Sequence, residues 1–139
     1  MSLLFGEDAR VARWVAARIF GPGGGFDPCS AIGVERDGDL AAGVVYHDWQ
    51  PDFGTMQLSI AADTPRWATP GTVAALLRYP FAQQGANKAW VAVPARNTRS
   101  LRLATGLGFV AEARLAEHFG DDDAVILRMF KREWRERYC

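Results

Sequence analysis

The hydrophobic pattern of the chain switches from the repeat of a strand to the repeat of a helix near its middle, and then switches back. Apolar and polar residues alternate over 55–60, which predicts a strand over 53–61. Thr69 and Pro70 then supply an N-cap and a first helical residue, so we expect a helix that runs to about Gln84. A short apolar run at 89–93 predicts the next strand. A helix between two neighbouring strands requires them to be parallel or to separate, so the sheet is predicted to be mixed.

The segments on either side of this crossover complete the pattern. We expect helices over 8–20 and 98–105, strands over 29–36 and 40–48, and a final hairpin over 109–117 and 124–131. The predicted fold class is α/β in the α+β sense: a mixed, mostly antiparallel central sheet with a splayed strand pair and flanking helices. Pro80 lies inside the central helix and cannot donate to the carbonyl of Leu76, so we also expect a kink or early fraying there.

Length and composition limit the classes of protein to which the chain can belong. Its 139 residues correspond to one domain, which we place over 1–139, and 16 basic residues balance 16 acidic ones. This balance argues against a nucleic-acid partner, and no apolar run reaches membrane-spanning length. Cys29 and Cys139 have no cysteine or histidine nearby at metal-ligand spacing, so we expect free thiols, no metal and a cytoplasmic protein.

The last third of the chain carries a spaced motif. Asn97 is followed by Ser100 three residues later, and by Gly108 and Phe109 eleven and twelve residues later. This spacing resembles the GNAT superfamily of N-acetyltransferases, especially its branch that acetylates the N-termini of ribosomal proteins. The resemblance extends over roughly residues 29–132 and implies a GNAT-like fold. The segment before it leaves little room for the first strand and the paired first helices that are usual in the family.

The resemblance also implies a reaction. An acetyl group would pass directly from acetyl-coenzyme A, a cosubstrate, to a primary amine, without a metal. In the family, the third strand of the meander separates from the next strand and its backbone binds the pantetheine arm, while a helix N-terminus binds the pyrophosphate. In this chain the matching cofactor-binding positions are Ile60, Ala61, Ala62, Arg66, Gly71, Thr72, Asn97, Ser100 and Arg102.

Two of these assignments have a purely structural alternative. Asn97 can cap the helix that begins at Thr98, with or without a contact to the cofactor. Arg102 recurs with Arg96 and Arg99 at every third residue, which suits either the 3′-phosphate of the cofactor or a solvated helix face.

The sequence departs from the family pattern at two places. Thr64, Trp67 and Thr69 stand at the aligned positions of the pyrophosphate loop, where the family has Gln or Arg, Gly, and Gly or Ala. The family's Tyr seven residues after the Asn is replaced by Ala104. The alternative function is therefore a GNAT-fold binding or accessory protein that has lost catalysis. A nucleic-acid-associated factor that uses the arginine-rich helix is a third, weaker hypothesis.

The acid and the base of the reaction have to come from other residues. Ser100 is the nearest replacement for the missing Tyr as the acid that protonates the thiolate. The strand over 53–61 has no Glu, which leaves Gln57 or Ser59 to relay the amine's proton through a water. The titratable alternatives for the base are His47, His118 and Asp63.

Two further segments bear on the partners of the protein. Residues 37–63 contain five Asp and no Lys or Arg, which would favour an amine substrate, although the preference of Asp for turns explains the pattern equally well. Trp134 in the C-terminal tail is expected to pack on the domain or on a neighbouring subunit, which leaves a homodimer open.

Overall fold

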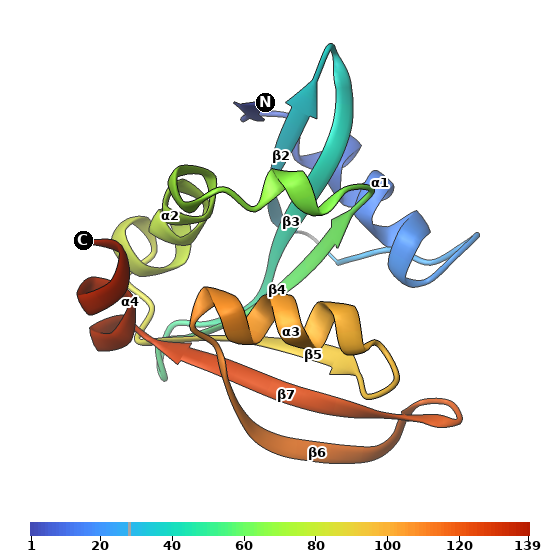
Figure 1. The fold of residues 1–139 in the computed structure, drawn as a ribbon, viewed down its shortest axis with the longest axis vertical. Coiled ribbons are helices and arrows are strands. Elements are labelled where there is room, and N and C mark those ends of the chain that lie inside the picture. The colour runs from blue at the N-terminus through green and yellow to red at the C-terminus, as the bar shows by residue number, and fades with distance from the viewer. Residues whose placement is uncertain (28) are drawn as a thin grey trace.

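A computed structural model describes residues 1–27 and 29–139, and its centre is a seven-stranded sheet. The strand order is β1-β2-β3-β4-β5-β7-β6, and β4 and β5 are the one parallel pair in this sheet. The strands are β1 (Ser2–Leu4), β2 (Ser30–Arg36), β3 (Asp39–Gln50), β4 (Thr55–Ala62), β5 (Lys88–Pro94), β6 (Val110–Phe119) and β7 (Asp122–Phe130). The helices are α1 (Asp8–Ile19), α2 (Pro70–Arg78), α3 (Thr98–Leu107) and α4 (Lys131–Tyr138), with a 3₁₀ turn at Pro65–Trp67 and a π-helical turn at Tyr79–Gln83. This is the mixed, mostly antiparallel α+β fold that the sequence predicts (Figure 1).

Strand β1 differs from the sequence-based expectation. It pairs antiparallel with β2, and Leu3 lies opposite Val34. Three residues are enough to form this edge strand, so the expectation that the segment before Cys29 leaves little room for a first strand is wrong. A run of three residues shows no clear hydrophobic repeat, which is why the sequence gives no signal for it.

The helices divide between the two faces of the sheet. Helix α1 packs on β2 and β3, where its Val11 and Val15 are fully buried. Gly43 of β3 lies directly beneath the helix, because a Cβ at this position would come within 2.7 Å of Val15 Cγ2. Side chains of α2, α3 and α4 pack on the opposite face, which holds the larger core (Figure 1).

Pro80 changes the helical repeat of the central helix. The regular α-helix stops at Arg78 and continues as the π-helical turn. The carbonyl of Leu76, to which Pro80 cannot donate, accepts a hydrogen bond from the buried hydroxyl of Tyr46 at 2.7 Å. Desolvation at this buried position raises the pKa of Tyr46. The expected disturbance of the helix at Pro80 is therefore a change of repeat, supported by a side chain from β3.

Helix α4 closes the larger core. Trp134 is buried, and its ring stacks on Phe81 with the ring centroids 5.4 Å apart. Of the two arrangements that the sequence leaves open, the tail therefore packs on its own domain. Among the described residues, no helix combines the length and the apolar character needed to cross a membrane.

Candidate functional site

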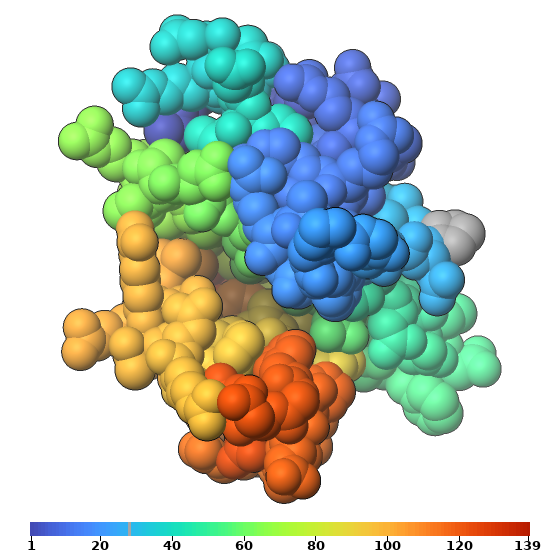
Figure 2. All heavy atoms as spheres, turned by 90° about the vertical axis from the view of Figure 1, so that its right-hand side faces the viewer, coloured from blue at the N-terminus to red at the C-terminus, as the bar shows by residue number. Residues whose placement is uncertain are grey.

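Strands β4 and β5 separate soon after they meet, and the opening between them is the starting point of the candidate site. They pair only where Thr55–Gln57 lies beside Lys88–Trp90. Beyond this point β4 stays with β3 as far as Ala62, and β5 stays with β7 as far as Pro94. Figure 1 shows the two strands diverging, and Figure 2 shows a hollow on that side between the N-terminal helix (blue) and the β6–β7 turn (red-orange). The predicted splayed strand pair is confirmed.

The alternation of hydrogen bonds along β4 decides which backbone groups face the opening. Asp63 donates its N–H to the carbonyl of Ala41 at 2.9 Å. In an antiparallel ladder every second residue bonds to the same neighbour, so Ala61 also directs its N–H and C=O to β3. Ile60 and Ala62 therefore direct theirs to the opening. Of the three strand residues expected to bind the pantetheine arm, Ala61 has no free backbone group on that side.

Polar side chains lie on the α1 face of the sheet next to the opening. Side chains alternate along a strand, so Gln57 and Ser59 share a face with Ala61, which packs against the cluster around α1. His47 lies opposite Gln57 on β3, and its Nε2 is 2.8 Å from the Oγ of Ser59. Burial lowers the pKa of His47, while the charge of Asp48 opposes that shift.

The N-terminus of α2 offers fewer free N–H groups than the resemblance implies. Thr69 is the N-cap, as predicted, and its Oγ1 accepts a hydrogen bond from the N–H of Thr72 at 3.3 Å. Pro70 has no N–H, so Gly71 keeps the free donor of the first turn, and the space around its Cα is open. Arg66 is exposed on the 3₁₀ turn that precedes the helix. Gly71 and Arg66 are thus accessible to an anion, whereas the N–H of Thr72 is already occupied.

Asn97 caps α3 on the other side of the opening. Its Oδ1 accepts a hydrogen bond from the N–H of Ser100 at 3.1 Å, which confirms the capping alternative. Ser100 itself is half-buried in the first turn. Arg99 and Arg102 are exposed on the same helix, and neither forms an ion pair with a described residue.

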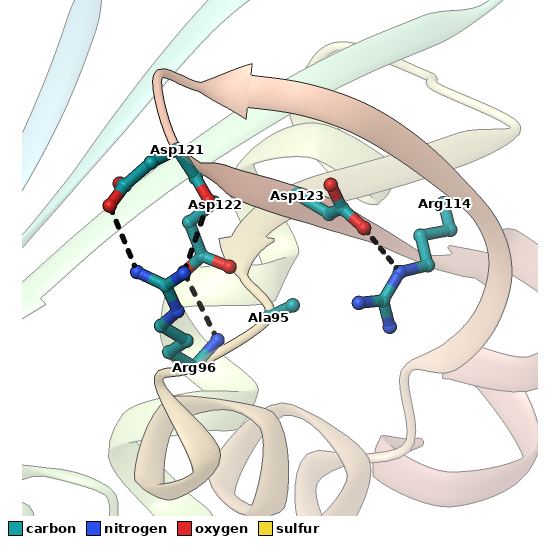
Figure 3. Close-up of a pocket in the computed structure, with 6 residues that line it drawn as sticks. All are labelled: Ala95, Arg96, Arg114, Asp121, Asp122 and Asp123. Atoms are coloured by element: carbon teal, nitrogen blue, oxygen red, sulfur yellow. Dashed lines mark hydrogen bonds and ion pairs between the residues drawn. The ribbon is translucent and has the colours of Figure 1, made fainter.

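Arg96, in contrast, is bound to the β6–β7 turn. Its Nη1 lies 3.2 Å from the carboxylate of Asp121, and its backbone N–H donates to Asp122. Arg114 pairs with Asp123 at 2.7 Å, so two ion pairs frame a hollow of about 260 Å³ (Figure 3). The expected cluster of three arginines is therefore reduced to the two that lie within α3.

The three titratable alternatives for the base occupy different environments. Asp63 forms two hydrogen bonds with Arg18, at 2.8 and 2.9 Å, and these hold its pKa below the ordinary value. His118 is exposed on the edge strand β6, beside the ring of Phe119. His47 is the one of the three that bonds to a side chain of β4 next to the opening.

His47 also borders a second hollow, of about 350 Å³, whose lining includes Asp48, Trp49 and Tyr79. Sequence reasoning singles out neither this hollow nor the contact between His47 and Ser59. The only available signal is that both residues are polar members of adjacent predicted strands, and their contact depends on a register that the turn between the strands sets.

No protein-family model matches the chain, and no curated protein matches its sequence. Solved structures do match it. The spermidine N-acetyltransferase SpeG F149A mutant from Vibrio cholerae aligns with a TM-score of 0.75 over 99% of both chains, at 14% identity. A candidate acetyltransferase from T. thermophilus aligns with a TM-score of 0.70 at 23% identity, covering 81% of this chain and 64% of the other. A chimera of V. cholerae SpeG and hSSAT aligns with a TM-score of 0.68 at 17% identity, covering 77% and 69%.

These identities are all low, so the likeness establishes the arrangement of the chain and not its activity. In this chain the arrangement includes the crossover helix α2 and the separation of β4 from β5, two features that the resemblance of the sequence implies. The chain has the GNAT acetyltransferase fold.

Proposed function

We propose that the chain is a single acyltransferase domain over 1–139 that transfers an acetyl group from acetyl-coenzyme A directly to a primary amine. The observation that carries the proposal is the opening between β4 and β5, into which Ile60 and Ala62 direct backbone groups that have no partner among residues 1–27 and 29–139. A thioester is already activated for attack. The protein therefore has to hold it beside an amine and to move protons, and neither task requires a metal.

The residues around the opening fit coenzyme A. Ile60 and Ala62 bind the amides of the pantetheine arm as a neighbouring strand would. Gly71 and Arg66 bind the pyrophosphate, because the N-terminus of a helix attracts anions. Arg102 binds the 3′-phosphate from the exposed face of α3.

Asn97, Ser100 and Gln57 complete the site. The Oδ1 of Asn97 is used by the cap of α3, which leaves its Nδ2 to donate to the pantetheine arm. The hydroxyl of Ser100, in the first turn of α3, supplies a proton to the departing thiolate. Gln57 lies where β4 and β5 part and holds a water beside the thioester.

The acceptor is an amine of a small molecule or the N-terminus of a protein. Relatives in structure are named as spermidine N-acetyltransferases, which makes polyamines the first small molecules to test. The resemblance to the ribosomal branch makes peptides with a free N-terminus the second class.

Isothermal titration with acetyl-coenzyme A tests the cofactor site directly. We expect saturable binding with one molecule per chain, and no detectable binding up to millimolar concentrations would refute the proposal. Release of free thiol in the presence of polyamines and of short peptides then tests transfer, with a reaction lacking amine as the control for hydrolysis.

A catalytically inactive GNAT-fold binding protein is the second candidate, and the N-terminus of α2 favours it. Pro70 and the contact between Thr69 and Thr72 reduce the free donors of the first turn to Gly71. Binding of acetyl-coenzyme A without transfer to any amine would support this candidate, whereas turnover would exclude it.

A further inference from the structure

The contact between Ser59 and His47 lies where the proposed reaction has to occur. Gln57 is the last residue of β4 that pairs with β5, and Ser59 is the next residue with a side chain on the same face. A pantetheine arm that binds along Ile60 and Ala62 cannot pass beyond Gln57, because the two strands close there. Its thioester therefore ends beside Ser59.

The strand register and an aromatic ring together hold His47 against Ser59. Across the ladder Ser59 pairs with Val45 and His47 pairs with Gln57, so the two polar side chains are diagonal neighbours on one face. Their Nε2 and Oγ atoms are 2.8 Å apart. The ring of Phe26 covers the imidazole, with the ring centroids 5.1 Å apart.

The surroundings of His47 favour its neutral form. The titratable groups that share its hollow are Cys29, Tyr46, Asp48 and Tyr79, and of these Asp48 acts on it by its charge. Desolvation outweighs this charge and lowers the pKa of the imidazole. With the proton on Nδ1, the free Nε2 accepts a hydrogen bond from the hydroxyl of Ser59.

We propose that Ser59 and His47 form the proton relay that deprotonates the acceptor amine, an inference that rests on the proposed transfer function. Ser59 is the catalytic residue that meets the amine, and His47 acts through it. In this relay the hydroxyl of Ser59 takes the amine's proton directly, and the water that Gln57 holds beside the thioester takes no part in that step. The pair also fills the role for which the strand offers no Glu.

Every proton and bond that changes during the transfer can be followed through the relay. As the nitrogen of a neutral amine bonds to the thioester carbonyl carbon, Ser59 Oγ takes the N–H proton and passes its own proton to His47 Nε2. The carbon–sulfur bond breaks and its electron pair leaves on the thiolate. The imidazolium of His47 then loses its proton, and the thiolate gains one, through Ser100 or water. The products are an amide and a free thiol, and Ser59 is regenerated.

Kinetics over a range of pH test the relay in the full chain. We expect His47→Gln and Ser59→Ala to bind acetyl-coenzyme A as the wild type does. Near neutral pH their kcat/KM should fall about 100-fold, and a fall of about tenfold is the smallest that the relay predicts. Wild-type kcat/KM, calculated on the concentration of neutral amine, should fall on acidification through the pKa of His47. This fall on acidification should be absent in His47→Gln. The difference in kcat/KM between His47→Gln and the wild type should decrease toward about pH 9.5. The double variant should be no slower than His47→Gln, because the two residues act as a unit.

Two matched variants separate chemistry from structure. Ser59→Thr keeps the hydroxyl and should retain activity within about threefold of the wild type, since the relay needs only that group. His118→Gln changes the other histidine of the chain on an exposed strand and should leave the pH profile unchanged. An equal loss at every pH in His47→Gln would indicate a structural role and would overturn the relay.

The remaining outcomes distinguish the relay from the function on which it rests. Absence of acetyl-coenzyme A binding in the wild type would refute both. Binding without transfer to any amine would overturn the relay and the transfer while leaving the cofactor site. Retention of kcat/KM by His47→Gln within about threefold would overturn the relay alone. NMR titration of His47 needs no acceptor, and an imidazole that is charged at neutral pH would also overturn it.

Discussion

The hydrogen bond from Tyr46 to the carbonyl of Leu76 predicts a specific thermodynamic coupling. Tyr46 is 2% exposed, and its hydroxyl lies 2.7 Å from an acceptor that Pro80 cannot serve. Tyr46→Phe leaves this buried carbonyl without the hydroxyl, so we expect the free energy of unfolding to fall by about 1–3 kcal/mol. Pro80→Ala restores an N–H at the position that normally bonds to this carbonyl. In that background the cost of Tyr46→Phe should drop to about 0.5 kcal/mol.

Urea denaturation of the four proteins measures this coupling, with an unchanged slope as evidence that the unfolded state is the same. Tyr79→Phe is the matched control. Its hydroxyl bonds to Ser30 in a half-buried position, so its loss should cost less than about 1 kcal/mol in either background. An equal cost of Tyr46→Phe with and without Pro80 would refute the view that Tyr46 compensates for the proline.

Three further predictions concern the opening and its rim. Ala62→Pro removes an N–H directed to the opening and should weaken acetyl-coenzyme A binding about fivefold by calorimetry, whereas Ala61→Pro removes an N–H of the β3 ladder and should mainly lower the melting temperature. Asn97→Ala should lower the free energy of unfolding by about 1 kcal/mol because it removes the cap of α3. Asn97→Asp keeps the capping oxygen but loses Nδ2. Weaker cofactor binding at unchanged stability in Asn97→Asp would therefore separate the cofactor contact of Asn97 from its role as a cap. Arg18 lowers the pKa of Asp63, so this pair stabilises the fold above the ordinary carboxyl pKa of 3.8 and the contribution disappears as the pH falls below it. The pair is exposed, so Asp63→Asn should lower the free energy of unfolding by less than about 1 kcal/mol at neutral pH and leave it unchanged in acid. An equal loss of stability at both pH values would contradict a contribution from the ionised pair.

The parts of the fold that the sequence predicts are those with a local cause. The change of hydrophobic period predicts the crossover helix and hence the separation of β4 and β5. Thr69 and Asn97 cap their helices because each side chain reaches the N–H three residues ahead. Strand β1 escapes prediction because three residues carry no periodic signal.

The candidate site is less predictable because its contacts depend on register. The diagonal contact between His47 and Ser59 exists only in the observed pairing of β3 with β4, and a slip of one residue would place one of the two on the other face. The free backbone groups of Ile60 and Ala62, as opposed to Ala61, follow from the same register. In the sequence Arg96 looks equivalent to Arg99 and Arg102. Only the position of the β6–β7 turn shows that Arg96 forms an ion pair with Asp121.

Amide chemical shifts during a titration with acetyl-coenzyme A test the central claim that the opening between β4 and β5 is an acyl-coenzyme A site. The backbone N–H groups of Ile60, Ala62 and Gly71 should shift with one common dissociation constant, whereas that of Ala61, bonded to β3, should shift less. Shifts confined to the hollow beside Tyr79, or no saturable shift at millimolar cofactor, would contradict the account.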